Sequence, residues 1–182
     1  TAVDKESVMI ENLWIGDTAH KKAILDDWFS AELPLNHFTG VVGDGSLNMV
    51  AFPDQASSLL ERLLALMAPG GKMAVRVFTR PSDIVSEDEV RSRMDLPWHA
   101  FRCYLNMHIA GNHGANIPSK NMLATFDRLF PDRERLCEQT GWDVTEISMS
   151  MDSYATSPTT TSFPRRRQWL GCLPTTARNA RL

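Results

Sequence analysis

Short apolar runs that end in acidic residues mark the first quarter of the chain. Three such runs, at residues 2–3, 24–25 and 41–42, are followed by Asp4, by Asp26-Asp27 and by Asp44. Runs of this length, bounded by glycine or polar residues, are typical of buried strands that open into loops. In an open α/β sheet, ligands bind beyond the carboxyl ends of the strands. We therefore expect three strand ends that bring carboxylates to a ligand-binding edge.

Between and after these runs, the apolar residues follow a helical period. Residues 9–16 predict one helix, and the leucines of residues 59–67 predict another, with Asp54 as a candidate N-cap and Pro69-Gly70-Gly71 as its stop. The strands predicted in this part of the chain cover residues 1–4, 21–25, 40–43 and 73–78. This alternation predicts a mostly parallel sheet with helices on both faces, joined by right-handed crossovers.

Beyond Pro81 the pattern is mainly helical. Ser86 and Glu89 form a capping box at the start of one helix, and Ser119 is expected to cap another. The further helices predicted here cover residues 98–110, 119–130 and 132–140, with Gly111 and Gly141 as stops. Residues 142–149 alternate imperfectly between apolar and polar side chains, and this pattern predicts a late strand.

The composition changes after Asp152, where the acidic residues stop. The remaining residues are rich in Ser, Thr, Pro and Arg, with five arginines and no Asp or Glu. Segments of this composition bury too little apolar surface to offset the entropy lost on ordering. We therefore expect one α/β domain over residues 1–152 and a poorly structured basic tail over residues 153–182.

The bulk properties exclude several classes of protein. With 182 residues, 43% of them hydrophobic, the chain is long enough for a single core. Its longest apolar run, residues 63–68, is far shorter than the roughly 20 residues that cross a bilayer, and no secretory leader opens the chain. The net charge of −3 and three widely spaced cysteines indicate neither a nucleic-acid surface, nor a disulfide framework, nor a metal site. We expect a cytoplasmic protein with no nucleic-acid or membrane partner.

The order of these motifs resembles that of the class I S-adenosylmethionine-dependent methyltransferases over about residues 1–80. The residues that carry the resemblance are Val3-Asp4, Asp27-Trp28, Val42-Gly43-Asp44-Gly45-Ser46-Leu47-Asn48, and the segment from Leu66 through Pro69-Gly70-Gly71 to Arg76-Val77-Phe78. The resemblance implies a Rossmann-like fold. It also implies an enzyme that transfers a methyl group from the cofactor S-adenosylmethionine to a substrate that the sequence does not name.

The resemblance implies a role for each strand end. Asp4, with Lys5 beside it, would bond the ribose hydroxyls of the cofactor. Asp27, with Trp28 as its neighbour, would contact the adenine amino group. The residues expected to line the space near the methyl group are Asp44, Gly45 and Ser46, and Asp44 is the nearest candidate for a general base.

The family's first strand and its glycine-rich loop, which wrap the methionine part of the cofactor, are missing. They should precede Thr1, and the chain starts directly on an expected strand, which we interpret as a missing N-terminus. In the family's sheet this strand lies between those that end here at Asp4 and Asp44. A buried backbone group without a partner costs about 1–3 kcal/mol. We therefore expect the chain to re-pair its strands or to be unstable alone, and in either case to bind the cofactor poorly.

Several residues allow a second interpretation. Asp4 can cap the next helix, and Asn48 can lie either in the site or at the start of a helix. Arg76, inside an apolar strand, needs an acidic or carbonyl partner if it is buried, and a structural ion pair is favoured over substrate contact. His99 and Arg102 share a helix face, which is either a substrate-side surface or a solvated one.

Two other functions fit part of the pattern. A non-catalytic nucleoside-binding remnant would keep the fold without turnover. A nicotinamide dehydrogenase also has an acid after its second strand, but the glycine fingerprint that would support it is not in the chain. We therefore expect a methyltransferase first and a nucleoside-binding remnant second.

Overall fold

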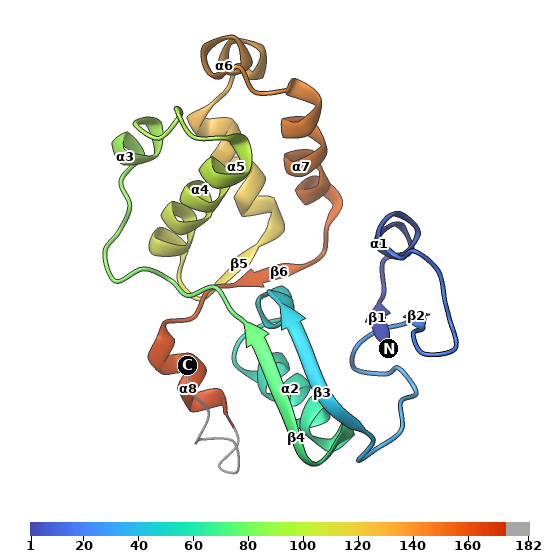
Figure 1. Ribbon diagram of the computed structural model, residues 1–182. Helices are drawn as coiled ribbons and strands as arrows, with labels where there is room; N and C mark the ends of the chain where they lie inside the picture. Colours follow the sequence, from blue (N-terminus) through green and yellow to red (C-terminus); the bar gives the residue numbers. More distant parts are fainter. Residues whose placement is uncertain (174–182) are drawn as a thin grey trace. The chain divides into compact units, whose positions relative to one another are not determined.

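The computed structural model describes residues 1–173 (Figure 1). It is an α/β structure, as predicted, with eight α-helices and three two-stranded sheets in these residues. The chain divides into two compact units. Unit 1 consists of residues 1–42 and 58–74, and unit 2 consists of residues 43–57 together with the residues from 75 onward. The domain extent predicted from the sequence, residues 1–152, stays a prediction.

The first elements of unit 1 follow the predicted order of strand, helix and strand. They are β1 (Ala2–Asp4), α1 (Ser7–Leu13) and β2 (Ala23–Leu25). β1 and β2 are parallel neighbours, with Val3 opposite Ile24. Parallel strands need a connection that crosses back over the pair, and α1 with the loop after it provides this connection.

A second strand, helix and strand follow in the chain. They are β3 (Phe38–Asp44), α2 (Asp54–Leu66) and β4 (Met67–Arg76). Backbone N–H···O bonds of 2.9 Å join the residues just before the two strands and also the residues at their far ends, so the strands are parallel (Figure 1). β4 starts directly after α2, so the predicted stop at Pro69–Gly71 is wrong, because pairing with β3 extends the strand through this segment.

The strands of residues 1–173 do not form one continuous sheet. β1 pairs with β2, β3 pairs with β4, and β5 (Asn116–Pro118) pairs in antiparallel direction with β6 (Thr160–Ser162). The predicted single sheet with helices on both faces is therefore replaced by three separate pairs. The alternative expectation, that the strands re-pair, is not met in these residues either, because no strand of one parallel pair bonds to a strand of the other.

One set of side chains along β3 and β4 is open to solvent. Half-buried and exposed residues alternate over residues 41–44 of β3 and 70–76 of β4, and Val42 is 86% exposed. The prediction of a buried run at residues 41–42 is therefore wrong for Val42. A ribbon of two strands can have one face covered while the other stays in water. Asp44 and Arg76 belong to the exposed set.

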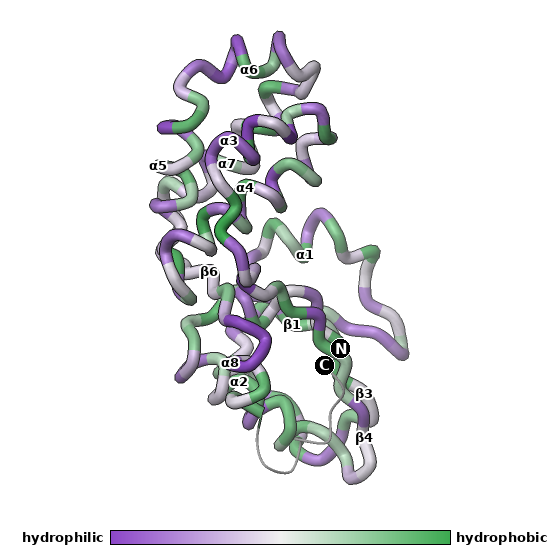
Figure 2. Tube along the Cα trace, turned by 90° about the vertical axis from the view of Figure 1, so that its left-hand side faces the viewer, coloured by the Kyte–Doolittle hydropathy of each residue, from purple (hydrophilic) through white to green (hydrophobic). Residues whose placement is uncertain are grey.

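Unit 2 is mainly helical. Its helices are η1 (Ser46–Met49, a 3-10 helix), α3 (Glu87–Arg91), α4 (Trp98–His113), α5 (Ser119–Leu129), α6 (Arg133–Thr140), α7 (Val144–Thr156) and α8 (Arg166–Cys172). Hydrophobic and hydrophilic residues alternate along the helices (Figure 2). α4 passes the predicted stop at Gly111, because a glycine inside a helix costs only about 1 kcal/mol. Gly114, with φ of 96°, follows its last residue.

Side-chain caps explain the starts of two helices. The Ser86 hydroxyl accepts the backbone N–H of Glu89 at 3.1 Å, and the Asp132 carboxylate accepts an N–H from the first turn of α6 at 2.9 Å. Gly141 ends α6 in the left-handed region, with φ of 73°. The predicted serine cap at Ser86 and the predicted stop at Gly141 are confirmed. Ser119 does not cap α5, because its hydroxyl bonds the carbonyl of the residue before β6 at 2.8 Å.

The segment from Trp142 to Met149 is helical from Val144 onward, so the predicted strand is wrong. The Asp143 carboxylate accepts two backbone N–H groups of the first turn, at 2.6 and 3.3 Å, and so caps α7. Ile147 and Met151, one helical turn apart, are 0% and 1% exposed. The burial therefore follows the helical period, and Met149, which strand alternation would have placed with Ile147, is exposed.

An aromatic cluster lies at the centre of unit 2. The ring of Phe101 lies 5.9 Å from Trp98, 5.6 Å from Phe130 and 4.7 Å from Trp142. Phe126 joins the cluster through Trp98, at 5.8 Å. Such ring pairs contribute roughly 0.5–1.5 kcal/mol beyond their burial. The cluster connects α4 and α5 with Trp142, which lies two residues before α7. This packing holds α4 beside α7.

The segment after Asp152 is structured as far as residue 173, so the predicted lack of structure is wrong there. Thr-rich residues form β6, and Phe163 and Trp169 are both 3% exposed. β-branched residues favour strands, and the two aromatic residues supply the buried surface that the composition did not reveal. The rest of the predicted tail, residues 174–182, lies outside the described residues.

Candidate functional site

The carboxyl edge of the β1–β2 pair brings two of the predicted residues together. Asp4 is the last residue of β1, and Asp27 follows the end of β2 at Leu25. The backbone N–H of Asp26 donates to the Asp4 carbonyl at 3.0 Å and so continues the pairing past the strands. Because the strands are parallel, both acids lie at the same edge of unit 1.

Both carboxylates keep an oxygen available. Asp4 is half-buried, and its Oδ1 accepts the backbone N–H of Glu6 at 2.9 Å, next to the start of α1. Asp27 is also half-buried, and its Oδ1 accepts the N–H of Phe29 at 2.8 Å. Within the part of the chain that the structure describes, neither Oδ2 has a hydrogen-bond partner. Lys5, beside Asp4, is exposed.

The loop that carries Asp27 is held in place by Trp28 and by an arginine of α2. The indole Nε1 of Trp28 donates to the Val3 carbonyl of β1 at 2.8 Å. Arg62 donates from Nε to the Trp28 carbonyl at 2.8 Å and from Nη2 to the Ala31 carbonyl. Arg62 lies between the leucines of the apolar stripe in the sequence, and only the fold reveals that it orders this loop.

The end of β3 carries an ion pair on its exposed face. Arg76 of β4 donates to both oxygens of Asp44, from Nε at 2.5 Å and from Nη2 at 2.6 Å. The predicted ion-pair interpretation of Arg76 is confirmed. Both side chains are about 65% exposed, so the pair contributes roughly 0–1 kcal/mol. A general base at Asp44 would have to release Arg76 first.

Gly45 and Ser46 form the turn after β3. Gly45 has φ of 68°, a left-handed conformation that suits glycine, and its N–H donates to the Arg76 carbonyl at 2.9 Å. Ser46 is the first residue of η1. The turn is therefore fixed by backbone geometry, and the predicted roles of both residues near a methyl group stay predictions.

The side chain of Asn48 is buried in unit 2 and hydrogen-bonded to its backbone. It is 2% exposed, and its Nδ2 donates to the carbonyls of Phe78, at 2.8 Å, and Ser162. Its Oδ1 accepts the Phe78 N–H at 2.9 Å. A further hydrogen bond joins η1 to β6: the Ser162 hydroxyl donates to the Leu47 carbonyl at 3.3 Å. This arrangement favours the structural interpretation of Asn48 over substrate contact.

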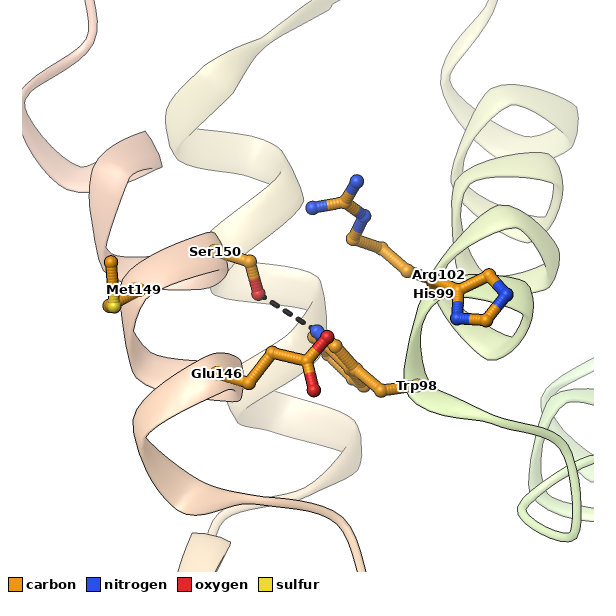
Figure 3. A pocket seen from close by; sticks show the side chains of 6 residues that line it. All are labelled: Trp98, His99, Arg102, Glu146, Met149 and Ser150. Carbon is orange, nitrogen blue, oxygen red and sulfur yellow. Dashed lines mark hydrogen bonds between the residues drawn. The ribbon is translucent and has the colours of Figure 1, made fainter. Parts of the chain in front are cut away.

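A pocket of about 320 Å³ opens between α4 and α7 of unit 2 (Figure 3). The residues that line it are Trp98, His99, Arg102, Glu146, Met149 and Ser150. Two of them, His99 and Arg102, were predicted from the sequence as substrate-side residues. The wall formed by α7 was missed, because residues 142–149 were predicted as a strand. The signal that identifies this wall is Asp143 followed three residues later by Glu146, an N-terminal helix pattern.

Trp98 and Ser150 are hydrogen-bonded in the pocket wall, whereas, in the part of the chain that the structure describes, the two charged side chains of the pocket are not. The Trp98 indole donates to the Ser150 hydroxyl at 3.0 Å, and this hydroxyl donates to the Ile147 carbonyl at 3.0 Å. The guanidinium of Arg102 and the carboxylate of Glu146 have no hydrogen-bond or ionic partner among residues 1–173. In Figure 3 these two side chains extend from opposite walls toward the space between the helices.

The described residues contain no group of three His, Cys, Asp or Glu side chains placed to hold a metal ion. Among residues 1–173, no helix combines the length and the hydrophobicity that a membrane crossing requires. Comparison of the chain with protein-family models, with curated proteins and with solved structures gave no match.

Proposed function

We propose that this chain is part of a class I S-adenosylmethionine-dependent methyltransferase, with a nucleoside-binding edge formed by Asp4 and Asp27. The observation that carries the proposal is the parallel β1–β2 pair. It brings two half-buried carboxylates to one edge, and each has one oxygen without a hydrogen-bond partner in the described part of the chain. The methyl acceptor is a substrate that the chemistry of these residues does not name.

The strand pairs give further support. In the family's Rossmann-like sheet, one strand lies between those that end here at Asp4 and at Asp44. If that strand is taken out, the neighbours left are β1 with β2 and β3 with β4, which are the two parallel pairs of the structure. The helix α2 between β3 and β4 is the crossover that such a sheet requires.

The edge suits the nucleoside of the cofactor chemically. The free oxygen of Asp4 can accept hydrogen bonds from the ribose hydroxyls, and that of Asp27 can accept one from the amino group of adenine. Both would be charge-assisted hydrogen bonds. Trp28 and Arg62 hold the Asp27 loop against β1, which pre-organises the second contact. The cofactor supplies an activated methyl group, so the protein mainly has to align the acceptor with it. Positioning of this kind is worth up to about 7–11 kcal/mol.

A non-catalytic nucleoside-binding remnant is the second candidate, and one observation favours it. Both oxygens of Asp44 are bonded by Arg76, so the nearest candidate base is occupied. Methyl transfer does not always need a base, because an acceptor can lose its proton to water. The two candidates share the nucleoside site at Asp4 and Asp27 and differ in turnover, which only an acceptor substrate can reveal.

Adenosine is the ligand that tests the shared site, because it lacks the methionine part for which the chain contains no glycine-rich loop. Titration followed by amide chemical shifts should give saturable shifts at residues 4–6 and 26–29, with a dissociation constant on the order of 1 mM. Asp4→Asn and Asp27→Asn should each weaken binding by roughly tenfold, which is the loss of one hydrogen bond to a charged group. Glu11→Gln, an exposed change on α1, is the matched control.

The outcome that contradicts the proposal is equally specific. The nucleoside site is absent if the amide signals of residues 4–6 and 26–29 do not shift at an adenosine concentration of about ten times the expected dissociation constant. The same conclusion follows if Asp4→Asn and Asp27→Asn bind adenosine as the Glu11→Gln control does.

A further inference from the structure

The pocket between α4 and α7 has rigid walls. Its residues from α4 lie within the first five residues of that helix, and those from α7 lie on one face at positions i, i+3 and i+4. Beneath them, Trp98 is 4% exposed and packs against Phe101 and Trp142. The pocket is therefore a feature of the packed core of unit 2 and does not depend on a loop conformation.

Two opposite charges face this space without a partner among residues 1–173. Arg102 is half-buried on α4, and Glu146 is exposed in the first turn of α7. The other polar groups of the pocket offer less, since the Trp98 indole and the Ser150 hydroxyl bond each other and the Ile147 carbonyl. Recognition of a ligand therefore falls to one guanidinium and one carboxylate, and His99 adds a further polar group at the rim.

A ligand with a single charge gains little here. An anion that binds Arg102 is repelled by Glu146, and a cation that binds Glu146 is repelled by Arg102. A small zwitterion satisfies both groups, because a carboxylate matches the planar guanidinium and an ammonium donates to the carboxylate. The volume of about 320 Å³ lies at the lower end of the range for small-ligand pockets and matches a small ligand.

We propose that this pocket binds a small zwitterion of the α-amino-acid class, with its carboxylate on Arg102, its ammonium on Glu146 and an apolar side chain toward Met149 and the edge of Trp98. Direct pairing of Arg102 with Glu146 is the competing state, and an exposed pair of this kind is worth only about 0–1 kcal/mol. The ligand can therefore displace it. The proposal does not depend on methyl transfer, and none of the residues expected to hold the cofactor lines this pocket.

L-leucine and two analogues that each keep one charge test the proposal on the unmodified chain. Isocaproate has the carboxylate without the ammonium, and isoamylamine has the ammonium without the carboxylate. L-leucine should shift the amides of residues 98–102 and 146–150, and each analogue should bind at least about tenfold more weakly, since it loses one charge-assisted contact. Adenosine, which carries neither charge, should leave these amides unshifted, so failure here is distinct from failure of the nucleoside site.

Variants of the two charged residues provide the second arm of the test. Arg102→Gln and Glu146→Gln should each weaken L-leucine binding by roughly tenfold. Arg135→Gln and Glu138→Gln, exposed on α6, are matched controls that should leave it unchanged. The double variant Arg102→Glu with Glu146→Arg restores the pair of opposite charges and should recover binding that either single reversal abolishes.

Three results overturn the proposal. The first is equal affinity for L-leucine and isocaproate or isoamylamine, which removes the need for both charges. The second is the absence of shifts at residues 98–102 and 146–150 on addition of L-leucine. The third is a loss of binding in the α6 controls as large as in the pocket variants, which assigns the effect to overall charge.

Discussion

Asn48→Ala is the substitution that separates a structural from a substrate-binding role for this residue. In the structure, the Asn48 amide makes three hydrogen bonds, two to the backbone of Phe78 and one to the carbonyl of Ser162. Alanine removes all three and leaves the Ser162 carbonyl, in a residue that is 0% exposed, without this donor. Asn48→Ala should therefore lose stability even when no ligand is present.

The magnitude follows from the environment of each bond. A hydrogen bond contributes about 0.5–1.5 kcal/mol net, and a buried group left unpaired costs about 1–3 kcal/mol. Phe78 is 39% exposed and regains water more easily than Ser162. We expect a total loss of about 3 kcal/mol, or roughly 6–12 °C in melting temperature for a chain of this size. Asn48→Asp should cost more, because it turns a carboxylate oxygen toward two carbonyls.

Urea unfolding followed by tryptophan fluorescence measures this loss, since Trp98 and Trp142 belong to the core of unit 2. Asn106→Ala, a half-buried asparagine of α4 without a hydrogen bond in the described structure, is the matched control and should change stability by less than about 0.5 kcal/mol. If Asn48→Ala unfolds within the same range as Asn106→Ala, the structural role assigned to Asn48 is wrong.

Three further predictions concern unit 2. Backbone N–H groups in the first turn of α7 lower the pKa of the Asp143 carboxyl in the folded protein. The stability that this carboxylate contributes is present above the pKa that Asp143 has in the unfolded chain, and it is lost as the pH falls through the lower pKa of the folded state. Asp143→Ala should therefore lower the urea midpoint at neutral pH and have progressively less effect in acid. Arg133 bonds one carboxylate on α5 and one on α7, so Arg133→Gln should cost about 1 kcal/mol more in urea unfolding than Arg135→Gln on the same helix. Burial raises the pKa of the Cys137 thiol, whereas Cys103 is exposed. Iodoacetamide should therefore alkylate Cys103 before Cys137, as measured by peptide mass spectrometry. Faster labelling of Cys137 would contradict the packing of α6.

The elements of the first half of the chain could be predicted because their signals are local. The apolar runs before Asp4 and Asp27 and the leucine stripe of α2 each lie within a few residues, and each formed the expected strand or helix. The extent of the sheet could not be read in this way. Strand pairing depends on which backbone edges meet, so three separate pairs and the exposure of Val42 appear only in the fold.

The second half shows how one local signal can override another. Residues 142–149 alternate imperfectly between apolar and polar side chains, which predicted a strand. The cap at Asp143 and the burial of Ile147 and Met151 show that the segment from Val144 is a helix. The error concealed one wall of the α4–α7 pocket. It also left Arg102 without the opposite charge that gives it a proposed function.

Contacts between distant residues account for what the sequence could not reveal about the candidate sites. Arg62 orders the loop at Trp28 across 34 positions, and Asn48 reaches Ser162 across 114. Neither spacing has a periodic signature. Arg76 is the exception, because a charged residue inside an apolar strand predicted an ionic partner, and the structure identifies that partner as Asp44.

The most direct test of the central claim is to locate bound adenosine on the chain with an azidoadenosine photoprobe and mass spectrometry. The probe should label the segment from Lys22 to Glu32, which contains the adenine contact proposed for Asp27. Labelling should be suppressed both by excess adenosine and by the Asp27→Asn substitution. Labelling outside this segment, or labelling that adenosine does not suppress, would contradict the nucleoside site and the methyltransferase proposal with it.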